Sequence, residues 1–228
     1  MPNATIALDI ETVGCEWDEL APEMQAYLRD RERDESKRGD VPNRLGLNPG
    51  TGRVVAIGIW YVDEARGVVL AEGPDAEWAP LDERAQILRG PEPVLLREFW
   101  KVVRDAGTIV TFHGRGFDGP YLMIRSAIVG VEPTRNLVPY RYGVREHCDL
   151  MDILTFWGSR PQYKFEFWCR QFGIASPKRD VQGADVAALV REGRIVEVAR
   201  YCLGDARATA ELYTRLRPMI KAMDASRG

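Results

Sequence analysis

The sequence is poor in the residues that build metal sites from nitrogen and sulfur. It has only two histidines, His113 and His147, and its four cysteines are far apart, with no Cys-x-x-Cys pair. This pattern argues against a structural zinc site and favours buried free thiols. No apolar run approaches the roughly 18 residues that a membrane span needs, and the first residues lack the basic and apolar regions of a signal peptide. We therefore expect a cytoplasmic protein that makes no contact with a membrane.

Neither sign of charge is in large excess, because the 228 residues carry a net charge of only −3. This balance argues against tight, non-specific binding of duplex nucleic acid, which depends on many Lys and Arg contacts to phosphate, and leaves room for a small basic groove. The length predicts that residues 1–228 form a single domain with a full hydrophobic core. The sequence does not decide the oligomeric state, and a homo-oligomer stays open.

The periodicity of apolar residues predicts a mixed sheet of five strands flanked by helices, which is an α/β fold. The two strands that follow the first are joined by the turn-like residues 63–66, so we expect them to form an antiparallel hairpin. The predicted elements, in order, are strands over 4–10, 53–62 and 67–71, a helix over 93–105, a strand over 108–112, a helix over 120–130, a strand over 148–153 and a helix over about 194–217.

A segment from about residue 15 to 52 interrupts this order between the first two strands. Its middle, residues 29–38, is almost entirely charged, and prolines and glycines follow it. We predict an exposed helix over about 18–38, then a loop, inserted into the domain. A solvated helix without a further role is the simpler interpretation. A lid or dimer contact is the alternative, because the insertion begins just after Glu11.

Four acidic residues and one tyrosine, from three separate segments, are the main candidates for function. Asp9 and Glu11 end the first strand, where alternation points both side chains to one side with Cα atoms roughly 6–7 Å apart. Two like charges at a buried strand end need compensation, and a cation supplies it. Asp118 opens a helix, which it would also cap. Tyr201 and Asp205 are spaced i and i+4, so they share one helical face.

In combination, these segments resemble the DEDD superfamily of 3′–5′ exonucleases, in the subtype that carries tyrosine in its third motif. Asp9 and Glu11 match the first motif, Asp118 the second, and Tyr201 with Asp205 the third. The resemblance spans nearly the whole chain and implies a ribonuclease H-like fold. Further similarity, to predicted exonucleases related to the proofreading domain of B-family DNA polymerases, lies in residues 148–152, 173–178 and 201–205.

The resemblance also implies cofactors, roles and a substrate. Two divalent cations, Mg²⁺ or Mn²⁺, would be held by Asp9, Glu11, Asp205 and, through water, Asp118. Tyr201 would be neutral and would orient the attacking water, and Glu11 is a predicted catalytic residue as well as a metal ligand. The reaction would release 5′-nucleotides from the 3′ ends of single-stranded nucleic acid, with DNA slightly favoured over RNA.

One position departs from the resemblance. The second motif of that family usually reads Asn-x-x-x-Phe-Asp, and here His113 stands in the asparagine place. Asparagine is neutral with a donor and an acceptor, whereas histidine can titrate near neutral pH. The contact that this position makes is therefore an open question.

The remaining candidates are weaker and carry alternatives. Core packing is an equally good explanation for Phe117, and a solvated loop is the simpler one for Lys178. Asp149 and Asp152 fit none of the three motifs, so we assign them structural roles. The residues predicted to contact substrate are Thr12, His113, Phe117 and Lys178.

Two other functions are compatible with the same residues. The first is a non-catalytic nucleic-acid-binding domain of the same fold, and the intact set of four acids and Tyr201 argues against it. The second is a ribonuclease H-like endonuclease, against which the Tyr-x-x-x-Asp spacing argues. Circular or end-blocked substrates would separate the second from an exonuclease.

Overall fold

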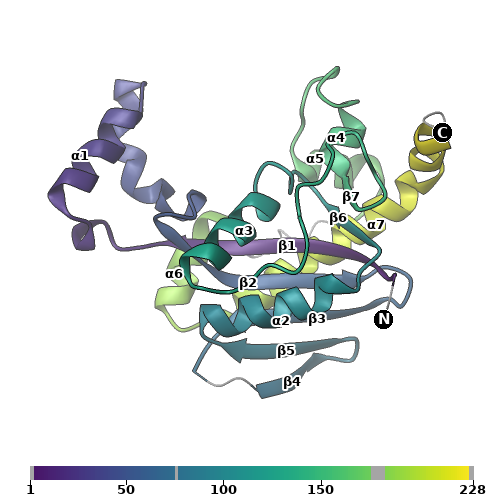
Figure 1. Cartoon of the computed structure of the whole chain (residues 1–228), viewed down its shortest axis with the longest axis horizontal. Helices are drawn as coiled ribbons and strands as arrows, with labels where there is room; N and C mark the ends of the chain where they lie inside the picture. The colour runs from purple at the N-terminus through teal and green to yellow at the C-terminus, as the bar shows by residue number, and fades with distance from the viewer. Residues whose placement is uncertain (1–2, 75–76, 176–182, 226–228) are drawn as a thin grey trace.

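The computed structural model describes residues 3–74, 77–175 and 183–225, which form a sheet covered by helices (Figure 1). The strands are β1 (Thr5–Gly14), β2 (Gly52–Tyr61), β3 (Arg66–Glu72), β4 (Glu77–Asp82), β5 (Ala85–Gly90), β6 (Thr108–Thr111) and β7 (His147–Asp149). The α-helices are α1 (Pro22–Arg31), α2 (Glu92–Arg104), α3 (Asp118–Ile128), α4 (Leu150–Leu154), α5 (Phe165–Gln171), α6 (Val186–Arg191) and α7 (Ile195–Ala225). Short 3-10 helices are η1 (Trp17–Glu19), η2 (Glu35–Leu47) and η3 (Gly183–Asp185).

The sheet is mixed, as predicted, and β1 lies inside it. The strand order in the described residues is β4-β5-β3-β2-β1-β6-β7. β1 pairs antiparallel with β2 and parallel with β6, and β6 pairs parallel with β7. β2 and β3 form the expected antiparallel hairpin. β6 pairs only with residues 5–7 of β1, so the end of β1 that carries Asp9 and Glu11 pairs with β2 and extends past the end of β6.

The prediction of five strands is wrong, because the sheet has seven. The two additional strands, β4 and β5, pair with each other antiparallel, and β5 adds to the outer edge of β3 in parallel. β4 exposes almost every side chain, with only Leu81 buried, and contains Pro80. An exposed edge strand with a proline lacks the apolar alternation that marks a strand in sequence.

The last predicted strand, over 148–153, is also shorter than expected. β7 ends at Asp149, and the chain turns at once into α4. The Asp149 carboxylate accepts a hydrogen bond from the backbone N–H of Met151, which caps this helix. The cap ends the strand, so the apolar residues that follow it are helical.

Alternation along β1 divides its side chains between the two faces of the sheet. Ile6, Leu8 and Ile10 pack in the core beneath α2 and α3, whereas Ala7 packs in the core beneath α7. Figure 1 shows α2 and α3 in front of the sheet and α7 behind it. Asp9 and Glu11, which follow the register of Ala7, therefore face α7.

The segment between β1 and β2 is helical but less regular than predicted. Instead of one helix over 18–38 it forms η1, α1 and η2, and η2 extends over residues expected to be a loop. Every residue of α1 is exposed or half-buried, so no apolar stripe anchors a longer helix. Figure 1 shows α1 projecting from the body of the molecule. Val41 and Leu45 of η2 are buried and fix the base of the projection.

Two further features of the described residues concern the helices and the thiols. Among the described helices, none has both the length and the apolar character that crossing a membrane requires. The four cysteines are free, as predicted, with Cys148, Cys169 and Cys202 buried and Cys15 half-buried. Whether residues 1–228 behave as a single domain stays a prediction.

Candidate metal centre

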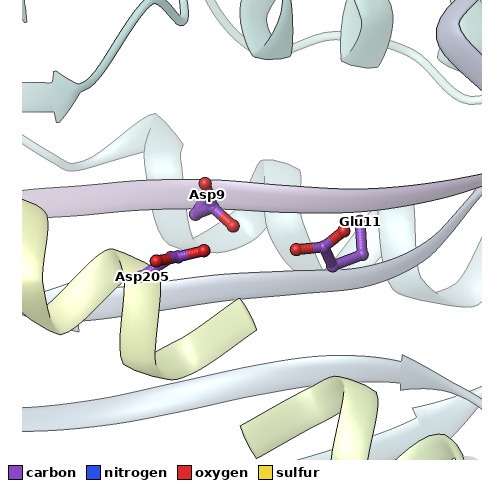
Figure 2. A group of neighbouring side chains, drawn as sticks. All are labelled: Asp9, Glu11 and Asp205. Carbon is purple, nitrogen blue, oxygen red and sulfur yellow. The ribbon is translucent and has the colours of Figure 1, made fainter. Parts of the chain in front are cut away.

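Three carboxylates from two elements converge on one point at the sheet. Asp9 and Glu11 project from β1, and Asp205 projects from α7 toward them (Figure 2). One carboxylate oxygen from each residue lies within 4.8 Å of the oxygens of the other two. This spacing suits three oxygen ligands around one hard cation. These three acids, 196 positions apart at the extremes, therefore meet in the fold.

A positive charge would stabilise the carboxylates of this cluster. Burial raises the pKa of Asp9 well above its usual range, and the charges of Asp205 and Glu11 raise it further. Asp9 Oδ2 is buried and finds no hydrogen-bond partner among the described residues. A buried acceptor in that state is costly, and a bound divalent cation would satisfy it. The donor set, all carboxylate oxygens, fits Mg²⁺ or Mn²⁺ better than a soft metal.

Asp118 lies close to this cluster but outside it. It is the first residue of α3, is 6% exposed, and adds its charge to those that raise the pKa of Asp9. Burial raises the pKa of Asp118 itself to about 7, with a further contribution from the charge of Asp149. Asp118 therefore lies near the cluster, and its contact with a cation through water stays a prediction.

Tyr201 lies one helical turn before Asp205 and faces the same cluster. Its phenol is hydrogen-bonded to the Asp205 carboxylate. Burial, together with the charges of Asp205 and Glu11, raises the pKa of Tyr201 above its ordinary value. The hydroxyl is therefore protonated at neutral pH, as expected, and can act as a hydrogen-bond donor.

Comparison with known proteins decides the family. Residues 51–227 match the family described as predicted 3′–5′ exonucleases related to the exonuclease domain of PolB. The chain belongs to this family. It is 29% identical over 187 residues to a DNA polymerase of Desulfurococcus sp. (strain Tok), covering 75% of this chain and 23% of the polymerase. A DNA polymerase of Thermococcus gorgonarius is 30% identical over 177 residues, covering 71% of this chain and 22% of that protein.

The fold agrees with the family. The structure of the family B DNA polymerase from the hyperthermophilic archaeon Pyrobaculum calidifontis matches with a TM-score of 0.60 and 22% identity. The match covers 96% of this chain and 25% of the polymerase. The ribonuclease H-like fold is thereby confirmed. The chain spans less than a quarter of the polymerase sequences it matches, so it corresponds to one part of those proteins.

The loop of the second family motif, residues 113–118, explains the histidine in the asparagine place. His113 has a φ of 68°, in the left-handed region, and its backbone N–H donates to Asp149 Oδ1 at 2.8 Å. Asparagine and histidine are both enriched in that conformation, whereas most residues avoid it. Asp149 Oδ2 accepts from the N–H of Arg115 at 2.9 Å. Asp149 therefore braces this loop, in keeping with its predicted structural role.

The predicted substrate contacts are spread around the site. Thr12 donates its hydroxyl to the carbonyl of Gly46 at 2.7 Å, which ties η2 to β1. Phe117 is half-buried and packs 5.4 Å from the ring of Tyr121, so it contributes to the core. His113 is exposed. Lys178 lies outside the described residues. A substrate contact by any of these four stays a prediction.

Gly58 is a site residue that sequence reasoning missed. It pairs with Asp9 across β1 and β2, on the face covered by α7. A Cβ at Gly58 would lie 2.7 Å from the backbone oxygen of Cys202 and 3.0 Å from the backbone nitrogen of Leu203. Only glycine lets α7 come this close, and Asp205 then reaches Asp9. A lone glycine inside a β-branched strand marks such close approaches, and that signal was present in the sequence.

Gly58→Ala should weaken divalent-cation binding at this cluster by about tenfold or more, because the added methyl group pushes the backbone of α7 away from β2. We expect a loss of stability of about 1–3 kcal/mol as well. Isothermal titration with Mn²⁺ and thermal unfolding measure the two effects. Gly39→Ala is the matched control, since its Cβ would meet no described atom within 4 Å. Wild-type Mn²⁺ affinity in Gly58→Ala would contradict the role of this close contact.

Proposed function

We propose that this chain is a metal-dependent 3′–5′ exonuclease that shortens single-stranded nucleic acid, DNA in preference to RNA, and releases 5′-nucleotides. The observation that carries the proposal is the meeting of Asp9, Glu11 and Asp205 around the unpartnered, buried Oδ2 of Asp9. Carboxylates that face one another around a buried oxygen repel each other and destabilise the fold, and a bound cation offsets this repulsion. Membership of the exonuclease-related family supports the reaction class.

The residues divide into holding and positioning roles. Asp9, Glu11 and Asp205 would hold a pair of divalent cations, with Asp118 acting on one of them through water. Two such ions, when bound, supply a nucleophile at neutral pH and neutralise the charge that develops on the leaving oxygen. Tyr201 would orient the attacking water, because its protonated hydroxyl donates a hydrogen bond and its raised pKa prevents it from acting as the base.

A degradation assay with single strands labelled at the 5′ end tests the proposal. With Mg²⁺ or Mn²⁺ we expect a ladder of products that shortens by one nucleotide at a time and is abolished by a chelator. The released product should be a mononucleotide with a 5′ phosphate. Matched DNA and RNA strands in the same assay measure the preference between them, which depends on contacts near the 2′ position.

The same assay separates the competing functions. A block at the 3′ end should stop degradation, and a circular single strand should remain intact. Cleavage of the circular strand would instead identify an endonuclease. Binding of the strand without cleavage in either metal would identify a non-catalytic nucleic-acid-binding domain.

A further inference from the structure

An exposed aromatic surface lies outside the metal centre. It is formed by the loop before β7 and the turn after α4. Tyr140 is 77% exposed, Tyr142 is 46% exposed and Phe156 is 48% exposed. The rings of Tyr140 and Tyr142 are 5.7 Å apart, and Tyr142 lies 5.9 Å from the ring of Trp157. We call these four residues the aromatic platform. A contiguous group of exposed aromatic side chains commonly marks a surface that binds a ligand or partner.

The backbone that presents two of these rings is held in an unfavourable conformation. Phe156, Trp157 and Gly158 are consecutive and all left-handed, with φ values of 49°, 53° and 93°. A left-handed bulky residue costs on the order of 1–3 kcal/mol and persists only where its surroundings fix it. The indole Nε1 of Trp157 donates to the carbonyl of Arg141 at 3.1 Å, which fixes the turn against the neighbouring loop. Strain of this kind is concentrated at functional sites.

Arg115 connects the aromatic platform to the second motif. It belongs to the 113–118 loop, and its guanidinium donates to the backbone carbonyls of Pro139 at 2.8 Å, Gly143 at 3.0 Å and His147 at 2.9 Å. The loop that carries Tyr140 and Tyr142 is therefore tied to the loop that positions Asp118. These hydrogen bonds hold the two loops against each other.

A cavity lies between these two loops. Its volume is about 290 Å³, and its lining includes His113 and Gly116 of the first loop, Pro139 and Arg141 of the second, and the acids Asp149 and Asp152. Small-molecule sites begin at about this size. The exposed ring of His113 thus faces a space that runs from the second motif toward the aromatic platform.

The loop that carries Tyr140 and Tyr142 is basic. Residues 135–145 contain three arginines and no acidic residue. The side chain of Arg141 is 61% exposed beside Asp152, and that of Arg145 is 83% exposed beside Asp224. Guanidinium groups bind phosphate oxygens in a bidentate manner, so these arginines can exchange an exposed carboxylate for a phosphate.

We propose that the aromatic platform, with Arg141, binds the single strand upstream of its 3′-terminal nucleotide by stacking its bases on Tyr140, Tyr142, Phe156 and Trp157. The inference rests on the proposed function, because it assigns a substrate contact to the same site. Alternating aromatic rings and arginines bind single strands without sequence preference. A protein partner is less well matched, because exposed arginines lie beside the rings and Arg115 joins their loop to the 113–118 loop, which carries Asp118.

The double variant Tyr140→Ala/Tyr142→Ala tests the platform. Loss of two stacking contacts, each worth about 1–3 kcal/mol, should raise the KM for a long single-stranded oligonucleotide by about 30-fold or more. The KM for a dinucleotide, which is too short to reach the platform, should change by less than about threefold. The double variant Tyr140→Phe/Tyr142→Phe keeps the rings and should retain wild-type KM values. Tyr27→Ala is the matched control, since Tyr27 is 55% exposed on the projecting α1 (Figure 1).

The possible outcomes test the aromatic platform and the proposed exonuclease function separately. Equal KM values for the long oligonucleotide in the wild type and the alanine double variant would overturn the platform and leave the exonuclease intact. If the wild type cleaves neither substrate, the proposed function fails. In that case fluorescence anisotropy of the same oligonucleotide still tests the platform, and equal affinity of the wild type and the double variant overturns it. A change in molecular mass in solution without a change in KM or oligonucleotide affinity would assign the surface to contacts between copies of the chain and overturn the inference.

Discussion

Asp9→Asn should abolish nuclease activity, by on the order of 10³-fold or more, and should leave the metal-free protein as stable as the wild type or more stable at about pH 8. Asparagine keeps the size and one oxygen of the side chain but removes the charge that a cation needs. The same charge is unfavourable in the free protein, because burial and the neighbouring Asp205 and Glu11 raise the pKa of Asp9. A residue that is costly to the fold and necessary to the reaction is the expected signature of a functional site.

The labelled-strand assay and thermal unfolding in a chelator measure the two halves of this prediction. Asp105→Asn is a suitable control, because Asp105 is an exposed acid at the end of α2, on the opposite face of the sheet from α7. It should retain full activity. Activity of Asp9→Asn within about threefold of wild type would remove Asp9 from the reaction, since loss of a metal ligand has a far larger effect. A large fall in melting temperature would show instead that the carboxylate stabilises the fold.

The part of the site that the sequence predicts depends on local periodicity. Asp9 and Glu11 are two positions apart in a strand, so they must share a face whatever the rest of the fold does. Tyr201 and Asp205 are four positions apart in a helix, so they must share a face as well. The family resemblance then supplied the one fact that periodicity does not contain, which is that these two faces meet.

The part that the sequence does not predict depends on contacts between distant backbone and side chains. Asp149 accepts hydrogen bonds from the backbone of residues more than 30 positions away, and Arg115 donates to carbonyls across a similar interval. Backbone groups are the same at every residue, so no sequence pattern marks their partners. The hairpin of β4 and β5 was missed for a different reason, since an exposed edge strand has no need of apolar alternation.

At His113, the residue type seen in the sequence is explained by a backbone contact seen only in the structure. The identity of this residue looked like a departure from the family motif, and its backbone conformation shows what the position requires. A residue that tolerates the left-handed region is needed so that the 113–118 loop can turn back onto Asp149. The substitution of histidine for asparagine therefore preserves the loop and adds an exposed imidazole beside the cavity.

Asp9 and Asp118 should make the metal-free protein less stable as the pH rises above about 4, and the loss from Asp118 should level off near its folded pKa of about 7. Burial raises the pKa of Asp118 to about 7 and that of Asp9 well above its usual range. The folded state thus binds protons that the unfolded state, with carboxyl pKa values near 4, has already released. Stability conferred by these protons is complete below the unfolded pKa and is lost as the pH rises from there through the folded pKa. His147, whose pKa burial lowers to about 4, acts in the opposite direction, mainly below about pH 6.5.

Mg²⁺ should reverse this loss, because the cation replaces the protons. At a concentration about 100 times its dissociation constant, Mg²⁺ stabilises the folded state by about 2.7 kcal/mol, which corresponds to a rise in melting temperature of about 5–10 °C. The rise should be greatest near pH 8.5 and should shrink toward pH 6.5, where protons compete for the same oxygens. Thermal unfolding from about pH 4 to about pH 8.5, with Mg²⁺ and with a chelator, measures both effects. Asp9→Asn should show neither the full pH dependence nor the rise with Mg²⁺. An equal response to Mg²⁺ in that variant and the wild type would place the cation somewhere other than beside the buried oxygen of Asp9.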